Sequence, residues 1–141
     1  MSPDKARRVP GSPPEWMDHA ESDLRLARLA AGDESILREQ VCFHAQQAAG
    51  KAIKAVLVFR QIEFPLTHDI EALVELAEES GLQLPEAVCG AGMLSPYAVE
   101  TRYPGSCMDI TVSDVDEALH TAAQTISWAK RVLATSQGED Q

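Results

Sequence analysis

The sequence predicts an all-α protein, most simply an up-and-down antiparallel four-helix bundle with additional short helical segments. Apolar residues recur at three- and four-residue steps through four stretches of the chain, which is the spacing of one helix face. Residues typical of helix starts precede these stretches, and no useful length of sequence alternates apolar and polar residues as a half-buried strand does. The connections are short, which favours antiparallel neighbours.

The composition is that of one globular domain. The chain has 141 residues, of which 45% are hydrophobic, 24% charged and only 5% aromatic, so aliphatic residues and alanine must fill the core. We expect the folded domain to span 12–135. Polar tails at 1–11 and 136–141 have little apolar content and are expected to be mobile.

Charge and cysteine content narrow the function classes. The formal net charge of -10 argues against broad DNA binding, which depends on many lysines and arginines that displace counterions. Cys42, Cys89 and Cys107 form no C-x-x-C pair. Because three cysteines leave at least one outside any intramolecular disulfide, a reducing compartment is the simplest setting. No secretory or membrane-spanning stretch is visible, so we expect a cytoplasmic protein without membrane contact.

The first helix is expected from Ser12 to about Ala31. Its opening, Ser12-Pro13-Pro14-Glu15, combines a serine cap, prolines in the first turn and a glutamate that completes a capping box. Gly32 can supply a left-handed cap at the other end. The apolar stripe consists of Trp16, Ala20, Leu24, Ala27 and Ala31.

The third helix follows a loop that ends in Phe64-Pro65. We expect Thr67 to be its N-cap, because threonine can accept a hydrogen bond from an unpaired backbone N–H group. Asp69 and Glu71 then lie in the first turn, where negative charge is favourable. Gly81 ends the helix.

The remaining chain contains one interrupted region and one long helix. Prolines and glycines within 85–104 allow only short helical pieces, the clearest at 95–102. Ser113 and Asp116 resemble a capping box, so the final helix is expected to begin there and to continue for about 20 residues.

The second helix, expected over 34–60, carries a polar stripe. At 100° per residue its polar side chains share one side, while about half of the circumference is apolar. One interpretation is a solvated face whose lysines extend to water. The other is a shallow polar cleft that holds an anion such as a phosphate. The stripe contains Gln40, His44, Gln47, Lys51 and Lys54.

Three segments in this order resemble HEPN domains, the higher eukaryotes and prokaryotes nucleotide-binding family. They are CFHAQQAAGKAIKAVLV, FPLTHDI and LSPYAVETRYPG, within a match that covers Trp16 to Leu133. The resemblance implies a dimerising helical bundle in the cytoplasm of a prokaryote, frequently encoded beside a minimal nucleotidyltransferase. Many members are metal-independent ribonucleases or toxins of toxin–antitoxin pairs.

The sequence departs from the catalytic motif that the resemblance implies, which is arginine followed by four to six residues and histidine. After Arg102 the required positions hold Cys107, Met108 and Asp109. No histidine occurs before His120. Arg38 and His44 match the motif formally, but on a continuous helix they point about 120° apart and lie ~9 Å apart along the axis. These departures weaken the ribonuclease interpretation.

Other candidate residues have two interpretations each. Glu100 and Arg102 either tether an irregular segment or line a pocket in which the arginine clamps a phosphate. His68 and Asp69 suggest an acid–base pair, but adjacent helical residues diverge, so capping is the simpler role. Gly50 stands where similar sequences tend to carry glutamate, and either admits a partner's backbone or has no consequence. No residue spacing predicts a metal site.

Together these observations predict a nucleotide- or RNA-related component of a two-component, toxin–antitoxin-like system with a nucleotidyltransferase. A homodimer is expected, and no cofactor or metal. Two alternatives remain: a metal-independent HEPN ribonuclease toxin, and a non-catalytic module for dimerisation or partner binding. The phosphate-bearing ligand is predicted to bind in the polar cleft, at His44, Gln47, Lys51, Lys54, Glu100 and Arg102.

Overall fold

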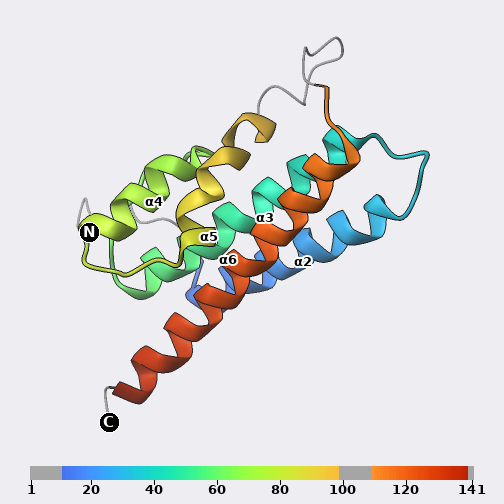
Figure 1. The fold of residues 1–141 in the computed structure, drawn as a ribbon. Coiled ribbons are helices and arrows are strands. Elements are labelled where there is room, and N and C mark those ends of the chain that lie inside the picture. Colours follow the sequence, from blue (N-terminus) through green and yellow to red (C-terminus); the bar gives the residue numbers. More distant parts are fainter. Residues whose placement is uncertain (1–10, 99–108, 140–141) are drawn as a thin grey trace.

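A computed structural model describes residues 11–98 and 109–139, and the regular structure in these two ranges is helical (Figure 1). This confirms the all-α prediction. The elements are α2 (Pro13–Ala31), α3 (Arg38–Phe59), α4 (Ile70–Glu79), α5 (Glu86–Cys89), the 3-10 helix η1 (Gly90–Ala98) and α6 (Val112–Glu139).

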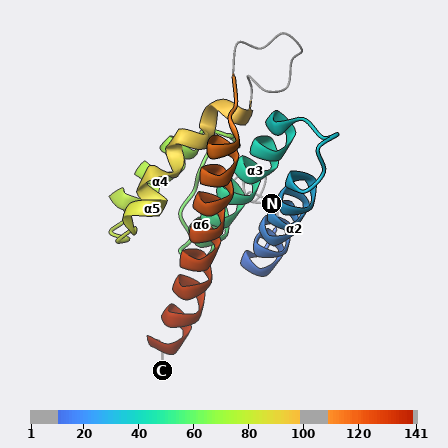
Figure 2. The ribbon, with the colours of Figure 1, turned by 45° about the vertical axis from the view of Figure 1, so that its right-hand side comes forward.

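Helix α3 lies at the centre of the bundle and contacts α2, α6, η1 and α4. The three long helices α2, α3 and α6 run side by side, and the shorter α4, α5 and η1 gather on the side away from α2 (Figure 2). The C-terminal turns of α6 project beyond the other helices in both views. No helix in the described part of the chain is long and apolar enough to cross a membrane.

Many of the buried side chains of α3 are alanines, which are small enough for neighbouring helices to pack close to it. Each of its buried alanines is completely inaccessible to solvent, and Ala20 and Ala27 of α2 are equally buried. Larger aliphatic side chains, among them Ile53, Leu57 and Leu73, fill the space towards the other elements. The buried alanines of α3 are Ala45, Ala48, Ala49, Ala52 and Ala55.

The start of α2 follows the predicted capping box, whereas its end differs. The Ser12 N–H group donates to Glu15 Oε1 at 2.8 Å, and the Glu15 N–H group donates to Ser12 Oγ at 3.3 Å. Gly32 has a φ of -84°, so the predicted left-handed cap is wrong. The buried stripe also includes Ala30 rather than the predicted Ala31, which is exposed.

Helix α3 begins at Arg38, four residues later than expected. The carboxylate of Asp33 accepts hydrogen bonds from the Ser35 N–H group at 2.9 Å and from the Ser35 hydroxyl at 2.6 Å. These local bonds stabilise a turn in place of the first helical turn, as aspartate and serine commonly do outside helices.

The N-cap of α4 is Asp69, so the prediction of Thr67 was wrong by two residues. The Asp69 carboxylate accepts a hydrogen bond from the Ala72 N–H group at 3.3 Å. Thr67 Oγ1 instead accepts from the Asp69 N–H group at 3.0 Å. Gly81 follows the end of the helix, as predicted. Its φ is +97°, a conformation in which a residue without a side chain is favoured.

The interrupted region forms α5 and η1, and the predicted piece at 95–102 lies partly outside the described residues.

The cap before α6 also differs from the expected Ser113. Thr111 and Asp114 exchange hydrogen bonds reciprocally, with lengths of 2.9 and 3.1 Å, in the manner of a capping box. Helix α6 then continues to Glu139, which makes it longer than expected.

Candidate functional site

The polar groups of α3 meet α2 along a line of contacts that we call the α2–α3 seam, formed by Trp16, Asp23, His44, Lys51 and Lys54. Lys51 Nζ donates to Asp23 Oδ2 at 2.7 Å, and the two side chains are only 26% and 16% exposed. His44 Nδ1 lies 3.7 Å from the other oxygen of Asp23. One carboxylate from α2 therefore faces two basic groups from α3.

One turn further along α3, Lys54 is 8% exposed and its Nζ lies 5.4 Å from the centre of the Trp16 ring. The ring of Phe64 packs against this indole edge to face. Burial, followed by the nearby charge of Lys51, lowers the pKa of Lys54. Lys54 has no ion pair with the side chains that the structure describes, in 11–98 and 109–134, so among these residues its charge is countered only by the aromatic ring.

Two further polar atoms of the seam are buried without a hydrogen bond to the described residues. They are Trp16 Nε1 and His44 Nδ1, whose 3.7 Å separation from Asp23 is too long for a hydrogen bond. Unpaired buried polar atoms cost free energy and are therefore uncommon in folded proteins. Trp16 Nε1 is thus unpaired near Lys54, and His44 Nδ1 is unpaired near Asp23.

Gln47 belongs to a different neighbourhood. Its Nε2 donates to Gln46 Oε1 at 2.7 Å and lies 3.1 Å from His68 Nδ1, while Gln46 Nε2 donates to the His68 carbonyl at 2.7 Å. The predicted polar stripe therefore divides: His44, Lys51 and Lys54 face α2, whereas Gln47 faces the loop that precedes α4. The other predicted ligand-binding residues, Glu100 and Arg102, lie outside the described residues.

The early arginine–histidine match does not form a pair. Arg38 Nη1 donates to the Ile110 carbonyl at 3.1 Å, beside the start of α6, whereas His44 faces Asp23 on α2. The later candidate, Arg102 with Cys107, lies in the part of the chain that the structure does not describe.

Asp23 and Trp16 belong to the seam, although neither was predicted as a site residue from the sequence. Asp23 lies seven residues after Trp16 and three after Ala20, which places it on the buried stripe of α2. A carboxylate in such a stripe needs a cationic partner, and the polar stripe of α3 offers one. Considering both stripes together would have predicted the contact.

The buried thiol of Cys42 is a poor nucleophile. Burial and then the charge of Asp114 raise its pKa to about 11. Burial likewise raises the pKa of Tyr97 to about 12, with a further contribution from Cys42. Both groups are neutral at physiological pH, and thiol chemistry requires the thiolate.

Among the described residues, no cluster of three or more histidine, cysteine, aspartate or glutamate side chains could hold a metal ion.

The fold and the seam define a helical-bundle protein whose central helix presents basic groups to its N-terminal neighbour. A family model, the HEPN domain, matches residues 14–132. Because this match covers most of the sequence, the chain belongs to the HEPN family, and the resemblance seen in its three sequence segments is confirmed.

Two solved structures support the assignment. The crystal structure of ST0689, an archaeal HEPN homologue, is 27% identical with a TM-score of 0.65, covering 86% of this chain and 97% of that one. The crystal structure of TT1696 from Thermus thermophilus is also 27% identical, with a TM-score of 0.69 and coverages of 85% and 97%. A comparison with curated proteins gave no significant match.

Proposed function

We propose that the chain is the HEPN subunit of a two-component, toxin–antitoxin-like system with a nucleotidyltransferase, and that it binds a phosphate-bearing ligand at the α2–α3 seam. The ligand is a nucleotide or an RNA phosphate, and the subunit acts as a homodimer. The observation that carries the ligand proposal is Lys54, a cation that is only 8% exposed and has no ionic partner among the described residues.

The charges of the seam favour an anion at Lys54. Asp23 already offsets the charge of Lys51, whereas Lys54 has no carboxylate beside it among the described residues. A phosphate placed against Lys54 would supply the missing negative charge in surroundings of low dielectric constant, where such a pair is stronger than in water. The indole N–H group of Trp16 is a nearby donor that still lacks a partner among the described residues.

The separation of Arg38 from His44 supports a non-catalytic role. A general acid or base must reach the same reacting group as its partner residue. Because Arg38 bonds to the Ile110 carbonyl and His44 faces Asp23, these two side chains are not arranged to act on one phosphodiester. We therefore favour ligand and partner binding over ribonuclease activity.

Calorimetric titration with ATP and GTP tests the ligand proposal. The wild-type chain is expected to bind at least one of them, and Lys54→Met, which keeps the length of the side chain but removes its charge, is expected to weaken binding at least about tenfold. Lys51→Ala is expected to have a smaller effect, because Asp23 already pairs with Lys51. Arg131→Met, an exposed change on α6, is the matched control.

Absence of nucleotide binding by the wild-type chain, or equal weakening by Arg131→Met, would reject the seam as a nucleotide site. The partner proposal has its own test, which is co-expression with any nucleotidyltransferase encoded next to this gene. A stable complex that purifies together through size-exclusion chromatography is the expected result. Separate elution of two folded proteins would contradict the pairing.

A further inference from the structure

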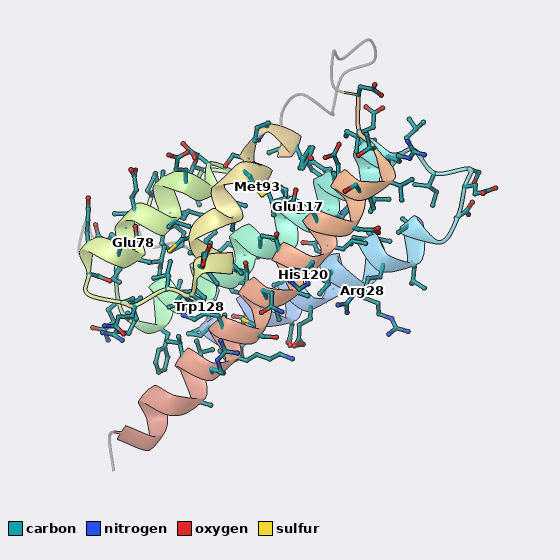
Figure 3. All side chains as sticks on the ribbon, in the orientation of Figure 1. Arg28, Glu78, Met93, Glu117, His120 and Trp128 are labelled. Carbon is teal, nitrogen blue, oxygen red and sulfur yellow. The ribbon has the colours of Figure 1, made fainter. Side chains whose placement is uncertain are left out.

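A second feature of the molecule lies on the other side of α2. A groove of about 610 Å³ runs between α2 and α6, and we call it the α2–α6 groove. None of the residues predicted to bind the ligand lines it. In Figure 3, Arg28 extends outward from α2 beside this groove, on the face of the molecule that also shows His120 of α6. Its main side chains are Leu24, Arg25, Arg28, Leu29, Ile126 and Lys130.

The groove is basic although the chain is acidic. Three of the twelve lysines and arginines line it, and the one acidic residue in its lining is Glu21, in a protein with a net charge of -10. Glu21 forms an ion pair with Lys130. Arg25 and Arg28 are exposed and have no ion pair or hydrogen bond from their side chains within the described ranges. The groove therefore offers two uncompensated guanidinium groups.

The floor and one wall of the groove are apolar. Leu24 and Ile126 are 6% and 5% exposed and form a well-packed base. Leu29, by contrast, is 64% exposed and stands beside the two arginines. An occupant that matches this surface must carry negative charge and also cover an exposed leucine.

We propose that the α2–α6 groove docks an amphipathic helix of another protein, with leucine-like residues against Leu29 and the groove floor and with acidic residues facing Arg25 and Arg28. Helices commonly bind in this way, with apolar anchors at three- and four-residue spacing and charges that set orientation. The inference does not depend on nucleotide binding at the seam, because the two surfaces share no residue.

Two other occupants fit the groove less well. A nucleic-acid strand would pair with the arginines but would leave Leu29 uncovered. In a second copy of this chain, the most acidic helix is α4, which exposes Glu71, Glu75 and Glu78. The apolar residues of α4 are already buried in its own core, so its outer face supplies charge without the required apolar contact.

The test uses a fluorescein-labelled synthetic helix of about 18 residues, or five turns, with leucines along one face and glutamates beside them. Fluorescence anisotropy is expected to show saturable binding to the wild-type chain. Arg25→Glu combined with Arg28→Glu is expected to weaken binding at least about tenfold, and Leu29→Ser to weaken it several-fold. Arg60→Glu combined with Arg131→Glu makes the same change in net charge outside the groove lining and is expected to leave binding within about twofold.

Any one of the following binding results would overturn the proposal: no saturable binding by the wild type, equal binding of a scrambled peptide of the same composition, equal binding of poly(U), or equal weakening by the control variant. Analytical ultracentrifugation of the Arg25→Glu, Arg28→Glu variant gives a further test. Loss of a homodimer in this variant would identify a second copy of the chain as the occupant of the groove, and would therefore also reject the proposal. Calorimetry with ATP on this variant separates the proposals, because changes confined to the groove should leave the seam unaffected.

Discussion

The α2–α3 seam and the α2–α6 groove use the same helix in different ways. Asp23 points into the seam, where it bonds Lys51 and lies near His44. Arg25, only two residues later, lines the open groove and has no side-chain partner in the described part of the chain. Because two residues on a helix are about 200° apart, neighbouring charges on α2 belong to different surfaces.

The comparison separates charges that stabilise the fold from charges that remain available for recognition. The Asp23 and Lys51 side chains are mostly buried, so loss of one partner leaves the other poorly solvated. Arg25 and Arg28 are solvated whether or not anything binds. Substitutions in the seam should therefore change the free energy of unfolding, and substitutions in the groove should change binding instead.

The largest expected effect is that of Asp23→Ala. It removes the carboxylate that bonds Lys51, and we expect a loss of about 2 to 3 kcal/mol in the free energy of unfolding, measured by urea denaturation followed by circular dichroism. Asp18→Ala, an exposed change on the same helix, is the control and is expected to lie within about 0.5 kcal/mol of wild type. Equal effects of the two variants would remove the distinction between seam and surface.

Raising the pH into the alkaline range is expected to lower the free energy of unfolding by a comparable amount, through ionisation of Cys42 on the core side of α3. Folding raises the pKa of this thiol from about 9 to about 11, so the stability that its neutral form provides is present below pH 9 and is lost as the pH rises through 11. The loss attributable to Cys42 is about 2 to 3 kcal/mol. It is measured as the difference in pH slope between wild type and Cys42→Ala in urea unfolding, and parallel slopes would contradict the prediction.

A smaller effect of opposite sign is expected from Gly50→Ala in the middle of α3. A Cβ atom at this position would lie 3.8 Å from Ile70 Cγ1, which is an ordinary contact. Removal of a glycine from the helix should therefore stabilise the protein by about 0.5 to 1 kcal/mol in thermal or urea unfolding. Gly81→Ala is the matched control and is expected to destabilise, because its φ is +97°. Destabilisation by Gly50→Ala would show that α3 needs the glycine.

The smallest effect on stability is expected from Arg25→Ala combined with Arg28→Ala. Neither arginine has an intramolecular side-chain partner among the described residues, so the urea midpoint should correspond to a change within about 0.5 kcal/mol. A loss as large as that of Asp23→Ala would show that the groove contributes to the fold and would weaken the contrast with the seam.

Much of the fold could be predicted because the helices are amphipathic and begin with recognisable caps. Ser12 and Glu15 form the expected capping box, and α4 ends just before Gly81, as expected. The errors were at helix ends where several residues could cap. Hydrogen bonds from Ser35 to the Asp33 carboxylate form a turn, so that α3 begins later than expected. Asp69 caps α4 in place of Thr67. Such choices depend on local bonds that residue spacing alone does not reveal.

Less of the candidate site could be predicted, because its geometry depends on which neighbour each polar side chain meets. A helical projection places Gln47 beside Lys51 and Lys54, yet Gln47 bonds Gln46 and lies against His68. The partner of Lys51 is Asp23, which comes from a helix 28 residues earlier in the chain. A projection of one helix contains neither the packing partner nor the side from which it approaches.

Gln46 sets a chemical requirement at a single buried position. It is 1% exposed, its amide nitrogen donates to the His68 carbonyl, and its amide oxygen accepts from Gln47. Glutamate has the same shape, but its ionised form would place an acceptor against the His68 carbonyl, and leucine would remove both hydrogen bonds that the Gln46 amide makes. Position 46 therefore tolerates neither greater charge nor greater hydrophobicity, and the chain can change there only if the loop before α4 changes with it.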